Sequence, residues 1–120
     1  MTNTPKLTAA DLRQFTGTEH WYRHPLNRKI LYTDGVKYLA EHAGAYWLLD
    51  EIALIQPIKI FADEPFQVWK LVVNDHTGTL TCEDGNDRLV YSKSLSYTDF
   101  PLPEITLYCT DGVILLPSEY

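Results

Sequence analysis

The sequence has few cysteines, widely spaced glycines and no uninterrupted apolar run long enough to cross a membrane. The two cysteines among 120 residues, Cys82 and Cys109, lie in separate strand-like segments, so we expect buried, reduced thiols. The six scattered glycines form neither a phosphate-binding loop nor a dinucleotide fingerprint, and we therefore expect no cofactor. The longest apolar stretch, residues 43–60, is interrupted by charged residues and Pro57, which predicts a core element rather than a membrane span.

Basic residues are also scarce, and their distribution is uneven. The chain has 10 Lys and Arg against 16 Asp and Glu, a net charge of -6, and a 45% hydrophobic composition that predicts one compact domain over residues 1–120. Residues 61–120 carry ten of the acidic side chains and only three basic ones. This asymmetry either marks a partner surface or keeps the second half soluble. Because no basic segment near Met1 leads into an apolar run, we expect no secretory signal and a cytoplasmic protein without membrane attachment.

Helical patterns are confined to the first half. Thr8 can cap a short helix that runs to about Phe15, and Asp34 can cap a second helix that Gly44 ends. The apolar positions of this second helix recur at helical spacing: Val36, Leu39, Ala40 and Ala43. Residues 45–56 are apolar nearly all round, which predicts the central helix of the core, and Pro57 ends them. These two helices together predict a helical hairpin over about residues 34–56.

The second half has the alternation and turn residues of strands. We expect a brief strand at 29–33 and five further strands, at residues 66–74, 79–83, 88–95, 104–109 and 113–116. The predicted fold class is α+β, with N-terminal helices packed on a C-terminal antiparallel sheet of four to five strands. A terminal strand at 113–116 would expose an unpaired edge that a second copy of the chain could cover, giving a homo-oligomer.

The candidate site residues are Glu19, His20, His24 and Asp34. His20 and His24 are spaced four apart, as two metal ligands on one helical face would be, and in an extended segment they still share one face. A third ligand could come from Glu19, His42 or Asp50. The zinc-protease pattern His-Glu-x-x-His is absent, so the sequence favours ordinary surface or packing histidines, and no metal is predicted.

Two other chemistries lack support in the sequence. There is no Gly-x-Ser-x-Gly element, and neither cysteine lies in a nucleophile signature. The second helix of the hairpin has Asp50, Glu51 and Gln56 but no Lys or Arg, which argues against major-groove reading of DNA.

Two N-terminal motifs resemble a known family. They are LRQFTGTEHWYRHP at 12–25 and YTDGVKYLA at 32–40, the latter continuing into AYWLLDEIA at 45–53. Together they resemble an uncharacterised family, a domain of unknown function, found in small bacterial proteins and in phages and plasmids. The resemblance covers roughly residues 7–75. It implies a bacterial, cytoplasmic setting associated with mobile elements and transfers no catalytic or binding residue.

Three functions remain open, in order of preference. The first is a non-catalytic protein acting through protein–protein interaction, because the chain has an acidic half, many aromatics and no catalytic signature. The second is a small metal-dependent or acid–base enzyme that uses the segment from Glu19 to His24, together with Asp34. The third is weak nucleic-acid binding by the basic and aromatic N-terminal region, which the overall negative charge opposes.

Overall fold

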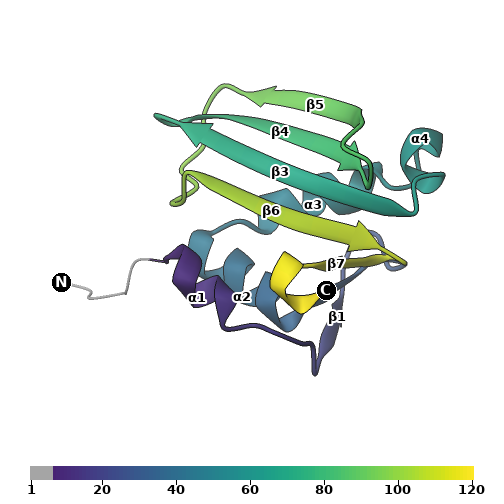
Figure 1. The fold of residues 1–120 in the computed structure, drawn as a ribbon, viewed down its shortest axis with the longest axis horizontal. Coiled ribbons are helices and arrows are strands. Elements are labelled where there is room, and N and C mark those ends of the chain that lie inside the picture. The colour runs from purple at the N-terminus through teal and green to yellow at the C-terminus, as the bar shows by residue number, and fades with distance from the viewer. Residues whose placement is uncertain (1–6) are drawn as a thin grey trace.

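The computed structural model describes residues 7–120 as an α+β fold built on one mixed sheet (Figure 1). The sheet order is β1-β2-β7-β6-β3-β4-β5. The strands are β1 (Trp21–Arg23), β2 (Leu31–Thr33), β3 (Phe66–Asn74), β4 (Thr77–Asp84), β5 (Leu89–Leu95), β6 (Glu104–Thr110) and β7 (Val113–Leu115). The helices are α1 (Ala9–Arg13), α2 (Asp34–Ala43), α3 (Tyr46–Ile55), α4 (Lys59–Ala62) and the 3-10 turn η1 (Pro117–Glu119).

The sheet is larger than predicted and is not purely antiparallel. The prediction of a sheet of four to five strands was wrong: the five C-terminal strands are joined by β2, which was expected as a brief strand at 29–33, and by β1, giving seven. These two strands also lie between α1 and α2, so the helices do not all precede the sheet. β2 pairs in parallel with β7, joining Leu31 to Val113. Strands of three residues are too short to show alternation, and their position depends on that distant partner.

The last strand is internal, which corrects the prediction of an exposed edge at residues 113–116. β7 lies between β2 and β6, pairing with both. The edges of the described sheet are β1 and β5. Any association between copies through the backbone of β7 is therefore blocked by the fold itself, since both sides of this strand already have a partner.

The helical hairpin over residues 34–56 is confirmed as α2 and α3, which lie together on one face of the sheet (Figure 1). Thr33, rather than Asp34, caps α2, because its hydroxyl accepts a hydrogen bond from the Val36 N–H. Gly44 ends α2 in the left-handed conformation with φ 61°, where a glycine costs least. α3 contributes four fully buried side chains to the core: Leu48, Leu49, Ile52 and Ala53.

The opposite face of the central strands mixes polar side chains with apolar ones such as Val68, Val72 and Tyr108. Its positions include Lys70, Thr79, Thr81 and Glu83, and the Lys70 ammonium lies 3.3 Å from the Glu83 carboxylate. Most of the carboxylates of residues 61–120 lie in turns and loops outside the strands. The negative charge of the second half is therefore spread around the sheet's ends and does not form one acidic face.

Hydrogen bonds to Glu119 hold the C-terminal segment against the start of α2. The Glu119 carboxylate accepts hydrogen bonds from the Thr33 hydroxyl at 2.6 Å, the Gly35 N–H at 3.1 Å and the Thr18 hydroxyl at 3.3 Å. A negative group suits this position because the N–H groups of a helix N-terminus carry partial positive charge. Gly35 allows the close approach, since a Cβ there would lie 2.6 Å from Leu116 Cδ1.

Candidate functional site

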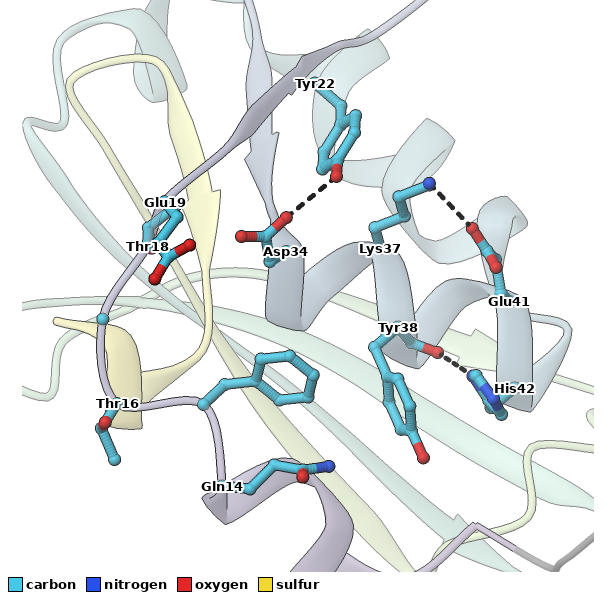
Figure 2. Close-up of a pocket in the computed structure, with 12 residues that line it drawn as sticks. Gln14, Thr16, Thr18, Glu19, Tyr22, Asp34, Lys37, Tyr38, Glu41 and His42 are labelled. Atoms are coloured by element: carbon cyan, nitrogen blue, oxygen red, sulfur yellow. Dashed lines mark hydrogen bonds and ion pairs between the residues drawn. The ribbon is translucent and has the colours of Figure 1, made fainter.

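A groove of about 760 Å³ lies between α2 and the segment that follows α1 (Figure 2). One wall is the exposed side of α2, and the other is the connecting segment 14–19 together with β1. Its lining residues are Gln14, Phe15, Thr16, Gly17, Thr18, Glu19, Tyr22, Asp34, Lys37, Tyr38, Glu41 and His42. The size falls within the range of ordinary ligand pockets, about 300–1,000 Å³.

The α2 wall follows from helical periodicity. Residues 34, 37, 38, 41 and 42 are three or four apart and therefore share one side of the helix. Val36, Leu39 and Ala40 occupy the other side and are fully buried. The apolar stripe that fixes α2 on the sheet thus necessarily presents the polar stripe to the segment 14–19.

Asp34 is the most highly constrained carboxylate of the groove. The Tyr22 hydroxyl donates to its Oδ1 at 2.9 Å and the His20 N–H donates to its Oδ2 at 3.1 Å. Partial burial raises the pKa of Asp34, but the hydrogen bonds from Tyr22 and His20 outweigh burial and hold the pKa below its usual value. The same hydrogen bond to Asp34 raises the pKa of Tyr22. At neutral pH the pair is therefore a charged carboxylate with a neutral phenol.

Lys37 is the basic side chain of the α2 wall and is already engaged within the groove. Its ammonium lies 3.4 Å from the Glu41 carboxylate and 4.6 Å from the centroid of the Tyr22 ring. The contact with Glu41 raises the pKa of Lys37, so the side chain stays charged. Lys37 pairs with Glu41, and among the described residues neither Glu19 nor Asp34 forms an ion pair with a lysine or arginine.

Aromatic side chains form the lower part of the groove in Figure 2. The Tyr38 ring lies 5.2 Å from the Phe15 ring and 3.9 Å from the His42 ring, centroid to centroid. The His42 Nδ1 lies 2.9 Å from the Tyr38 carbonyl oxygen, which fixes the imidazole against the phenol. Flat rings beside carboxylates are suited to a planar cation, which can stack on one and form ion pairs with the other.

The structure brings together some of the predicted site residues. Glu19 and Asp34 both line the groove. His20 lies at its rim, exposed, with Nδ1 3.5 Å from the Asp34 carboxylate. His24 lies elsewhere, buried to 1% exposure beneath α3. The predicted common face of His20 and His24 is therefore not realised as a shared site.

Both ring nitrogens of His24 are engaged in structural hydrogen bonds. Nδ1 accepts from the N–H groups of Leu26 at 3.2 Å and Asn27 at 3.0 Å. Nε2 lies 2.8 Å from the Asp50 carboxylate, and since Nδ1 is an acceptor, Nε2 carries the proton and donates it. No lone pair of His24 is left for a metal. Among residues 7–120, no group of three His, Cys, Asp or Glu side chains has metal-binding geometry.

The two cysteines are free and buried, as predicted. Burial raises the pKa of Cys82 and of Cys109 to about 12, so neither forms a thiolate at neutral pH. Neither thiol lines the groove. Within the described residues, no helix is both long and apolar enough to span a bilayer.

Sequence reasoning missed half of the groove. Lys37, Tyr38, Glu41 and His42 were not named together, although their spacing marks the polar side of a predicted amphipathic helix. This polar stripe was the sequence pattern from which the α2 wall of the groove could have been predicted. On the opposite wall the sequence indicated only Glu19, because α1 ends at Arg13, before the predicted Phe15, and residues 14–19 form an irregular connection without periodicity.

The chain is an α+β domain with a groove lined by carboxylates and aromatic rings. A family model described as "Family of unknown function (DUF6876)" matches residues 6–120, and the chain belongs to this family. The resemblance to an uncharacterised family is thereby confirmed, and the match extends over the strand-rich half that the two motifs did not cover. No curated protein and no solved structure matches the chain.

Proposed function

We propose that the protein is a non-catalytic interaction module that holds a basic side chain of a protein partner, arginine above all, in the groove along α2. The observation that supports this most directly is the composition of the groove. It has the carboxylates of Glu19, Asp34 and Glu41 and a single lysine that is already paired. An incoming cation therefore meets the carboxylates of Glu19 and Asp34, neither of which pairs with a lysine or arginine among the described residues.

Arginine fits this groove better than lysine for two physical reasons. Its planar guanidinium stacks on aromatic faces such as those of Phe15 and Tyr38, while its fork of N–H groups pairs with a carboxylate in two-point fashion. A lysine ammonium supplies the same charge without the plane. A higher affinity for arginine than for lysine would therefore come from the aromatic rings of the groove. Binding that requires a positive charge would come from its carboxylates.

The test is an NMR titration of the ¹⁵N-labelled protein with short capped peptides of alternating arginine and glycine. We expect the arginine peptide to shift the amide resonances of α2 and of residues 14–19. A peptide with lysine in place of arginine should cause smaller shifts, and one with glutamate in place of arginine should cause none. The variant Glu19→Gln/Asp34→Asn should weaken binding about tenfold, since each partly exposed ion pair contributes roughly 0.2–1 kcal/mol. Asparagine can accept from the His20 N–H through its oxygen and donate to the Tyr22 hydroxyl oxygen through its NH₂ group, so both contacts of position 34 can be kept.

A matched control separates local charge from net charge. Asp99→Asn/Glu104→Gln removes the same two charges from exposed positions outside the groove. This variant should bind the arginine peptide as the natural protein does. Equal weakening in both variants, or an absence of shifts in α2 at low salt, would contradict the proposed groove.

An acid–base or metal-dependent enzyme remains the second proposal, because His20 contacts Asp34 at the rim of the groove. Its metal-dependent form predicts that Zn²⁺ raises the melting temperature of the natural protein but not of His20→Ala. A melting temperature that Zn²⁺ leaves unchanged would contradict the metal-dependent form, in which His24 could not take part because both its ring nitrogens are hydrogen-bonded. Nucleic-acid binding ranks third, because the groove carboxylates would repel phosphates.

We also propose a cellular location and a type of host for the protein. The family resemblance and the two reduced cysteines support a bacterial cytoplasm and an association with mobile elements. Isolation of the partner from such a host by crosslinking at Glu19 would test this setting directly.

A further inference from the structure

The outer side of α3 carries an apolar surface that the chain itself does not cover. Leu26, Leu54 and Ile58 are 67%, 52% and 55% exposed. They line two adjoining hollows of about 430 and 470 Å³, with Leu54 forming part of both walls. We refer to the three side chains and these hollows as the α3 surface. Single exposed apolar side chains are common, whereas a group that lines contiguous hollows marks an interaction site.

The α3 surface follows from the composition of the helix. α3 is apolar nearly all round, a pattern typical of a helix covered on every side. In this chain only the side containing Leu48, Leu49 and Ile52 is covered, by the sheet. Leu54 belongs to the uncovered side. The prediction of a central core helix is therefore met on one side of α3 and leaves the other side open.

The charges around the two hollows are opposite. One hollow is lined by Asp50 and Glu51, and the other by Arg28 and Lys29. Asp50 is half-exposed, with its second oxygen free of the His24 bond, whereas the Glu51 carboxylate is paired within the chain with the Lys93 ammonium at 2.7 Å. Across residues 7–120, neither Arg28 nor Lys29 forms an ion pair with a carboxylate. The surface thus has an acidic end, an apolar centre at Leu54 and a basic end.

We propose that the α3 surface is a self-complementary interface that binds a second copy of this chain about a two-fold axis near Leu54. In a two-fold interface, residue i of one copy meets residue j of the other, and j meets i. The rotation places the acidic hollow of each copy against the basic hollow of its partner. Two sets of opposite charges then flank one apolar centre, which is the arrangement of a hydrophobic core with a polar rim. This inference is independent of the proposed groove.

The first test is sedimentation velocity across a dilution series of the natural protein and two variants. Leu54→Glu places a carboxylate at the apolar centre and should shift the chain to monomer. Leu89→Glu makes the same change at an equally exposed leucine, which lies opposite Glu83 in β5, and should leave the dimer intact. Both positions are exposed, so both variants should keep the natural circular dichroism spectrum.

The second test exchanges the charges. Lys29→Glu should weaken dimerisation about tenfold or more, because it places like charges across the interface. Adding Glu51→Lys together with Lys93→Glu, which reverses the ion pair that Glu51 forms within its own chain, should restore much of the affinity, since each cross-pair is again of opposite sign. The proposal is overturned if the natural chain is monomeric at every concentration. It is equally overturned if Leu54→Glu still dimerises, or if Leu89→Glu alone abolishes the dimer, which would instead assign the contact to β5.

Discussion

Replacement of His24 tests whether this histidine is structural or a ligand. In the fold, His24 forms three hydrogen bonds, two received at Nδ1 from the N–H groups of Leu26 and Asn27 and one donated to Asp50. Alanine removes all three. Each lost bond costs about 1 kcal/mol, so His24→Ala should lower the free energy of unfolding by about 3 kcal/mol. The loss of the buried ring adds to this.

Asparagine at position 24 provides the graded comparison. Its side-chain oxygen occupies roughly the place of Nδ1 and can accept from the same two N–H groups, so only the bond to half-exposed Asp50 is lost. His24→Asn should therefore cost only about 1 kcal/mol. Urea unfolding followed by tryptophan fluorescence measures both changes, with His20→Ala as an exposed-histidine control expected within about 0.5 kcal/mol of the natural protein.

The reasoning fails if asparagine is as damaging as alanine, because the backbone acceptor would then contribute nothing. It also fails if His24→Ala is neutral. A loss of stability in the natural protein on adding a chelator would instead assign His24 or its neighbours to a metal.

Two further predictions concern stability. Gly35→Ala should destabilise the fold by about 2 kcal/mol in the same urea assay, because the added Cβ would lie 2.6 Å from the buried Leu116 side chain. The control Gly17→Ala should be neutral, because a Cβ at position 17 would have no atom within 4 Å. The raised pKa values of Cys82 and Cys109, each about 12, predict a loss of stability at alkaline pH. Above the unfolded thiol pKa of about 8.5 the unfolded chain releases protons that the folded chain retains, so stability should fall by up to about 1.4 kcal/mol per pH unit for each thiol until pH 12. A double Cys→Ala variant that keeps the full alkaline loss would contradict this assignment, as would reaction of either thiol with Ellman's reagent in the folded protein at neutral pH.

The sequence determined the elements whose signals are local. The start of α2 was predicted to within one residue, with Asp34 named as the cap in place of Thr33, Gly44 ends the helix as predicted, and α3 ends just before Pro57. The strands β3 to β6 follow from alternation between turn residues, and the burial of both cysteines follows from their place in those strands. In each case the residues that cause the helix end, the strand or the burial lie within a few positions of it, so the amino-acid sequence alone is enough to predict it.

Only the tertiary structure decided the sheet order and the site. The pairing of Leu31 with Val113 makes β7 internal, and Glu119 reaches the start of α2 across most of the chain. The groove likewise exists because α2 turns its polar side toward residues 14–19, a connection without periodicity. The environment of His24 depends on Asp50 of another element. Contacts between residues so distant in sequence depend on how the packed elements are oriented, and composition and spacing leave that orientation open.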